Sequence, residues 1–100
     1  MNATKKVAVC SRSFSQNSIL RSELLATYQH VTFNDAGLQL KGDSLVEFLM
    51  GHDKAIIALE AMDESVLSRL PKLQVISKYG VGMDRIDIVA MRTYGKRLGW

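Results

Sequence analysis

The chain has 100 residues, of which 47% are hydrophobic and one is proline, a composition typical of a compact domain with one modest core. Thirteen Lys and Arg against ten Asp and Glu give a formal charge of +3, and the scattered basic residues indicate no nucleic-acid partner. No apolar run approaches the roughly 20 residues of a membrane span, and no signal peptide is recognisable. With a single cysteine, Cys10, in an apolar run, we expect a soluble cytoplasmic protein without a membrane partner.

The first part of the chain alternates between strand and helix. Residues 7–10 form a continuous apolar run with β-branched side chains, which predicts a buried first strand. Apolar residues at helical spacing over 19–28 predict an amphipathic helix, with Ser15 or Asn17 available as its N-cap. A short second strand is expected at 31–33, followed by turn formers. These turn formers are Asn34, Asp35 and Gly37.

The next two elements are a helix and a strand. The helix is predicted to begin at Asp43 or Ser44, where Ser44 and Glu47 have the spacing of a capping box, and Gly51 is placed to end it. Residues 55–59 are apolar without polar alternation, which indicates a strand covered on both faces.

The last part of the chain repeats the alternation. Asp63 is expected to cap a short third helix that Pro71 ends, because proline lacks the backbone donor and its ring clashes with the preceding turn. A fourth strand is predicted at 73–76, and Asp87 is placed to cap a fourth helix. A fifth strand is expected to begin at 98–100.

Repeated strand-then-helix units joined by short loops predict an α/β fold. We expect a flavodoxin-like parallel sheet in the order 2-1-3-4-5, with helices on both faces and right-handed crossovers. Because the sequence stops within its fifth predicted strand, we interpret residues 1–100 as a partial domain truncated at that strand.

Ligands of open parallel sheets bind beyond the carboxyl ends of the strands, so the segments to search are 11–15, 60–63 and 79–84. The last is the most informative, because Gly80 and Gly82 directly follow a buried strand. Glycine permits positive φ and a close approach of a ligand, and exposed amides in such a turn suit a carboxylate or phosphate. Taken alone, two alternate glycines more often form only a tight turn.

A longer pattern surrounds these glycines. The stretch 70–88, Leu-Pro-Lys-Leu-Gln-Val-Ile-Ser-Lys-Tyr-Gly-Val-Gly-Met-Asp-Arg-Ile-Asp-Ile, resembles the corresponding segment of D-isomer-specific 2-hydroxyacid dehydrogenases, especially of their phosphoglycerate dehydrogenase-like branch. The positions that fit the family pattern are Pro71, Gly80, Gly82, Asp84, Ile86 and Asp87.

The resemblance implies the substrate-binding part of an NAD- or NADP-dependent oxidoreductase that acts on a D-2-hydroxy acid of the 3-phosphoglycerate kind, as a homodimer. It implies that Tyr79, Gly80, Val81 and Gly82 bind the substrate, with amides near Val81 and Gly82 holding its carboxylate. Arg85 stands where relatives often have Asn, and it is either an additional charge at this site or a solvated side chain.

Other parts of the family's machinery are not expected in this chain. It contains no Gly-x-Gly-x-x-Gly, so we expect the NAD-binding Rossmann domain to be absent, and the family's catalytic Arg, Glu and His are expected beyond Trp100. No residue is therefore assigned a catalytic, cofactor-binding or metal-binding role, and the 100-residue chain alone is expected to be inactive.

Two alternatives remain open. One is a non-enzymatic flavodoxin-like domain that binds a small acid or has a regulatory role, although a signalling receiver would need an acidic pair where Ser11 and Arg12 stand. The other is a dimerisation or scaffold piece whose turn has lost its ligand. His30 and His52 are expected to be surface or edge residues, and Cys10 an inert buried thiol.

Overall fold

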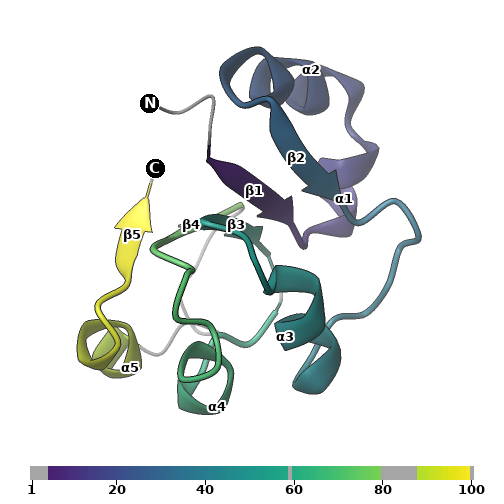
Figure 1. Ribbon diagram of the computed structural model, residues 1–100. Coiled ribbons are helices and arrows are strands. Elements are labelled where there is room, and N and C mark those ends of the chain that lie inside the picture. The colour runs from purple at the N-terminus through teal and green to yellow at the C-terminus, as the bar shows by residue number, and fades with distance from the viewer. Residues whose placement is uncertain (1–4, 59, 80–87, 100) are drawn as a thin grey trace.

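The computed structural model describes residues 5–58, 60–79 and 88–99, in which strands and helices alternate along the chain (Figure 1). In chain order the elements are β1 (Lys6–Val9), α1 (Arg12–Gln16), α2 (Ser18–Thr27), β2 (His30–Phe33), α3 (Asp43–Leu49), β3 (Lys54–Ile57), α4 (Glu64–Leu67), β4 (Val75–Lys78), α5 (Ile88–Thr93) and β5 (Arg97–Gly99).

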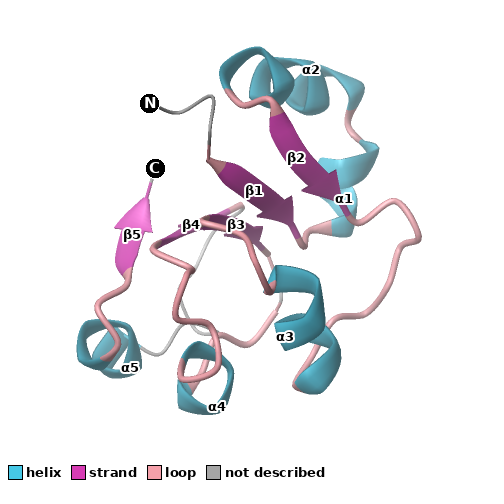
Figure 2. Ribbon diagram, in the orientation of Figure 1, coloured by secondary structure: helices cyan, strands magenta, loops and turns pink. Residues whose placement is uncertain are grey.

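The five strands form one parallel sheet in the order β2-β1-β3-β4-β5, which confirms the predicted topology (Figure 2). β1 lies between β2 and β3, with Ala8 opposite Thr32 on one side and Ala55 on the other. Because every strand runs in the same direction, all five carboxyl ends lie along one edge of the sheet.

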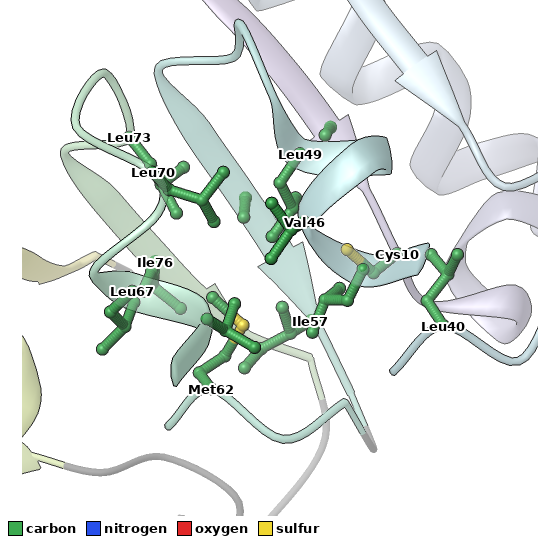
Figure 3. Close-up of a cluster of buried hydrophobic side chains, with 14 of the residues drawn as sticks. Cys10, Leu40, Val46, Leu49, Ile57, Met62, Leu67, Leu70, Leu73 and Ile76 are labelled. Atoms are coloured by element: carbon green, nitrogen blue, oxygen red, sulfur yellow. The ribbon is translucent and has the colours of Figure 1, made fainter. Parts of the chain in front are cut away.

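Helices cover both faces of the sheet, as predicted. Along β1, Val7 and Val9 point to the face covered by α1 and α2, and Ala8 points to the face covered by α3, α4 and α5. The cluster on the second face is the larger, and Figure 3 shows Leu49 of α3 and Leu67 of α4 with Ile57 of β3 among its buried side chains. This double coverage is the physical reason that β1 and β3 are apolar without alternation.

The segment after β1, for which no helix was predicted, contains one. Residues 12–16 form the short helix α1, and the Ser11 hydroxyl caps it by accepting the Phe14 N–H at 3.1 Å. Of the two N-caps considered for α2, the structure uses Asn17, whose Oδ1 accepts the N–H groups of Ile19 and Leu20. The Phe14 side chain, buried against β1, gives this short helix the tertiary contact that its length alone would not provide.

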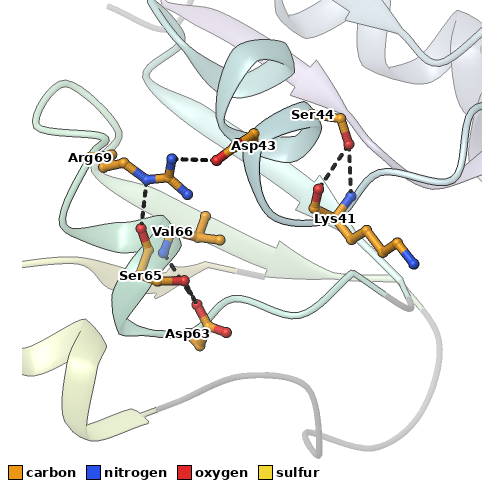
Figure 4. Close-up of polar contacts among 7 residues, drawn as sticks. All are labelled: Lys41, Asp43, Ser44, Asp63, Ser65, Val66 and Arg69. Atoms are coloured by element: carbon orange, nitrogen blue, oxygen red, sulfur yellow. Dashed lines mark hydrogen bonds and ion pairs between the residues drawn. The ribbon is translucent and has the colours of Figure 1, made fainter.

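The capping box predicted for α3 is wrong. α3 begins at Asp43 after Gly42, whose φ is +56°, and no side chain caps it. The Ser44 hydroxyl instead bonds the backbone of Lys41, accepting its N–H at 3.1 Å and donating to its carbonyl at 2.9 Å (Figure 4). Ser44 therefore fixes the loop that precedes the helix. Gly51, with a φ of +83°, follows the C-cap as expected.

The double coverage of β3 predicts a large cost for emptying its core positions. Ile57 is completely buried, so Ile57→Ala is expected to lower the free energy of unfolding by about 2–5 kcal/mol, because it leaves a cavity between β3 and α4. Ile19→Ala is the matched control, because this isoleucine is 69% exposed and its replacement is expected to change stability by about 0.5 kcal/mol or less. Urea unfolding of both variants measures the difference, and equal losses would contradict the assignment of β3 to the core.

Candidate functional site

A hollow of about 560 Å³ lies at the carboxyl ends of β1, β3 and β4. The strand order reverses between β1 and β3, and in open parallel sheets a crevice forms at such a reversal. The hollow draws on all three segments in which a ligand site was sought. Its lining residues are Ser11, Arg12, Ser13, Gln39, Leu40, Lys41, Ala58, Glu60, Ala61 and Tyr79.

A second hollow, of about 410 Å³, lies between α2 and the neighbouring face of β3 and β4. Its lining is mainly apolar and aromatic, including Phe14, Leu24 and Ile56. Among the described residues, Tyr79 alone belongs to both hollows. The hollow at the carboxyl edge is the candidate site, because polar and charged groups that can orient a small ligand converge there.

Tyr79 is the one described member of the predicted substrate-binding set. It directly follows β4, and its N–H donates to the Ile57 carbonyl at 2.7 Å, so the backbone stays paired with β3 up to the edge of the sheet. Its ring packs edge-to-face against Phe14 with centroids 5.3 Å apart. The other predicted members, Gly80, Val81 and Gly82, lie outside the described residues, as does Arg85.

Glu60 contributes a carboxylate that sequence reasoning did not assign to the site. Its Oε1 accepts the Ala58 N–H at 2.8 Å, and this bond takes the place of a ladder hydrogen bond where β3 ends. The side chain is half-buried, and its charge lies close enough to β1 to act on Cys10. Burial, and to a smaller extent the Glu60 carboxylate, raise the pKa of the Cys10 thiol well above its ordinary value. The sequence offered one signal for Glu60, namely its position directly after the strand predicted at 55–59.

Asn34 positions another wall of the hollow. It is 2% exposed, and its side-chain N–H groups donate to the carbonyls of Cys10 at 2.9 Å and Leu38 at 2.8 Å, while its Oδ1 accepts the Leu38 N–H at 3.0 Å. These bonds fasten the connection after β2 to the end of β1 and so bring Gln39 and Lys41 into the hollow. From sequence, Asn34 was only a turn former.

The charges of the hollow differ in exposure. Arg12 and Lys41 are exposed, and Figure 4 shows the Lys41 side chain extending away from its Ser44 contact. Among the described residues, the two ion pairs join Arg21 to Asp35 and Arg69 to Asp43, so neither Arg12 nor Lys41 is paired there. The rim therefore presents positive charge that attracts a small anion, above a half-buried carboxylate.

The two histidines lie away from this edge. His52 bonds Thr32 Oγ1 at 3.0 Å through Nε2, and together with His30 it lines a shallow hollow beside the C-terminus of α3. Cys10 is fully buried, as expected of an inert thiol.

Comparison with known proteins shows where this architecture recurs. Residues 7–98 match the family described as D-isomer specific 2-hydroxyacid dehydrogenase, catalytic domain. No curated protein matches the sequence.

No helix within 5–58, 60–79 or 88–99 is long and apolar enough to cross a membrane.

Solved structures share the fold. A protein of Polaromonas sp. JS6 66 described as a D-isomer specific 2-hydroxyacid dehydrogenase aligns with a TM-score of 0.84 and 24% identity, over 94% of this chain and 29% of its own. The NAD⁺-bound 3-phosphoglycerate dehydrogenase of Entamoeba histolytica aligns with a TM-score of 0.75 and 21% identity, over 96% of this chain and 32% of its own. D-lactate dehydrogenase of Escherichia coli aligns with a TM-score of 0.74 and 16% identity, over 93% of this chain and 29% of its own. The chain thus spans about a third or less of these proteins.

The wall that Asn34 holds should loosen when this side chain is removed. Asn34→Ala leaves buried carbonyls without donors, so we expect a loss of about 1–3 kcal/mol in the free energy of unfolding and faster hydrogen exchange at the Leu38 amide. Asn17→Ala is the control, because it removes only local hydrogen bonds at the start of α2, worth about 1 kcal/mol, and should leave exchange at Leu38 unchanged. Urea unfolding and amide exchange measure both effects. Unchanged exchange at Leu38 in Asn34→Ala would contradict the positioning role.

The raised pKa of Cys10 predicts a pH dependence of stability. Because the folded state holds the thiol proton more tightly than the unfolded state, stability is retained below the ordinary thiol pKa of 9.0 and is lost as the pH rises above it. The slope should approach about 1.4 kcal/mol per pH unit. Urea unfolding of the chain and of Cys10→Ala between pH 7 and pH 10 isolates this contribution, since the variant lacks only the thiol. Parallel pH profiles would show that Cys10 is not the cause.

Proposed function

The chain belongs to the D-isomer specific 2-hydroxyacid dehydrogenase family, and on this premise we propose that it is the substrate-binding part of an NAD- or NADP-dependent enzyme. The reaction interconverts a D-2-hydroxy acid and the corresponding 2-keto acid. Hydride transfer is the chemistry that the cofactor supplies; binding and orienting the acid is the part proposed for these residues.

The observation that carries this proposal is the polar hollow at the carboxyl edge. It combines the exposed cations Arg12 and Lys41 with the end of β4 at Tyr79, from which the chain passes to Gly80. A small 2-hydroxy acid is an anion, and unpaired positive charge at the rim of a crevice raises its local concentration. Orienting the bound acid is proposed to fall to backbone N–H groups that follow Tyr79.

The proposed substrate-binding residues are Tyr79, Gly80, Val81 and Gly82. Backbone N–H groups near Val81 and Gly82 are proposed to donate to the substrate carboxylate, since glycine lacks the Cβ that would keep a ligand away from the main chain. The Tyr79 ring packs against Phe14 and its N–H is paired with β3. Both contacts hold the residue that directly precedes the proposed binding glycines. Such pre-organisation lowers the entropic cost of binding.

The cofactor and the acid–base groups are proposed to come from outside these 100 residues. The glycines at 80 and 82 lack the third glycine of a dinucleotide fingerprint, so the residues present do not fit the pyrophosphate of NAD. The chain alone is accordingly proposed to bind the acid without turning it over. We further propose a cytoplasmic homodimer for the enzyme as a whole.

Titration with small acids tests the proposal. Adding D-lactate or pyruvate to the ¹⁵N-labelled chain is expected to shift the amide resonances of Tyr79, Val81 and Gly82, because the carboxylate is proposed to bind there. Lys41→Gln should weaken binding about threefold, since an exposed cation contributes modestly. Lys72→Gln is the control, because this exposed lysine precedes β4 and does not line the hollow. A folded chain whose edge resonances do not move would rule out the proposal.

A further inference from the structure

The Glu60 carboxylate lies within the hollow and does not project freely into solvent. Its Oε1 is bonded to the Ala58 N–H at 2.8 Å, which holds the side chain back over the end of β3. Its charge also reaches Cys10 at the end of β1, where it adds to burial in raising the pKa of the thiol. The hydrogen bond to Ala58 and the position of Glu60 in the lining place this carboxylate at the end of β3, inside the hollow.

This carboxylate acts on a bound ligand differently from the cations of the rim. Arg12 and Lys41 are exposed, so water and salt screen them, whereas Glu60 is half-buried and its field is screened less. The cations therefore attract any small anion to the hollow.

The sheet geometry determines which part of a substrate comes near Glu60. β3 and β4 are direct neighbours, with Ile57 opposite Lys78 and the Tyr79 N–H bonded to the Ile57 carbonyl at 2.7 Å. Neighbouring strands are about 5 Å apart, which is close to the length of a three-carbon acid from its carboxylate to its C3 substituent. An acid whose carboxylate is bound at the end of β4 and that extends toward β1 thus places this substituent over Ala58 and Glu60.

We propose that Glu60 is a specificity-determining residue, which selects a 2-hydroxy acid whose far end is an uncharged hydroxyl and disfavours one that carries a phosphate. The inference rests on the proposed function. A hydroxyl donates a hydrogen bond to the carboxylate oxygen that Ala58 leaves free, whereas a phosphate brings a second anion against it. The substrate is therefore of the D-glycerate kind and not of the 3-phosphoglycerate kind.

Three acids that differ only in the C3 substituent form the test: D-lactate, D-glycerate and 3-phospho-D-glycerate carry a hydrogen, a hydroxyl and a phosphate there. Dissociation constants are obtained by titrating each into the ¹⁵N-labelled 100-residue chain at one fixed ionic strength. We expect D-glycerate to bind most tightly and 3-phospho-D-glycerate to bind about tenfold more weakly than D-glycerate.

Glu60→Gln isolates the charge, because its amide oxygen still accepts the Ala58 N–H while the negative charge is gone. In this variant the preference for D-glycerate over 3-phospho-D-glycerate should fall by about tenfold. Glu47→Gln is the matched control: it removes the same charge from an exposed position on α3 that does not line the hollow, and it should leave the preference unchanged.

The outcomes separate this inference from the proposed function. If 3-phospho-D-glycerate binds the original chain at least as tightly as D-glycerate, or if Glu60→Gln and Glu47→Gln change the preference equally, the role of Glu60 is wrong while the edge remains an acid-binding site. If no acid shifts the resonances of Tyr79 and its neighbours in a folded chain, the proposed function fails and the inference fails with it.

Discussion

Burial of β1 and β3 on both faces is the constraint on which the other features depend. Residues 7–10 are completely buried, and in β3 no residue after Lys54 is more than 7% exposed. A strand in this environment has no water for its N–H and C=O groups, so its neighbours must pair with it along its whole length. The crossover connections between parallel strands supply the helices on both faces, and the common strand direction brings all carboxyl ends to one edge.

Side chains take over the backbone hydrogen bonds where the strands end, and these side chains build the candidate site. Asn34 donates to the Cys10 carbonyl at the end of β1, Glu60 accepts the Ala58 N–H at the end of β3, and Ser11 accepts the Phe14 N–H as α1 begins. The polar character of the hollow thus follows from the need to satisfy the main chain at the sheet edge. Fold and site are coupled there, because the groups that end the strands also line or shape the hollow.

The distribution of charge supports the same division between scaffold and site. Arg21 lies over the Phe33 ring at 3.9 Å and pairs with Asp35, and Arg69 of the loop after α4 pairs with Asp43 at the start of α3. These exposed pairs contribute little to stability, but they neutralise cations away from the hollow. Within the described part of the chain, the cations at the rim are left without such ion-pair partners, so a diffusing anion meets exposed positive charge at the carboxyl edge.

The sequence by itself determined the order of the five strands, the burial of β1, the covering of β3 on both faces and the sheet edge at which a ligand site is proposed. Apolar runs and helical periodicity are local properties, and the rules for parallel sheets convert their order into one topology. Tertiary structure alone decided that Ser44 bonds Lys41 and not its own helix, that residues 12–16 form a helix against β1, that Asn34 holds a wall of the hollow and that Glu60 lines it. The bond from Asn34 to Cys10 joins segments 24 residues apart. The local bonds of Ser44 and Glu60 depend on where α3 begins and β3 ends, which packing against the sheet decides.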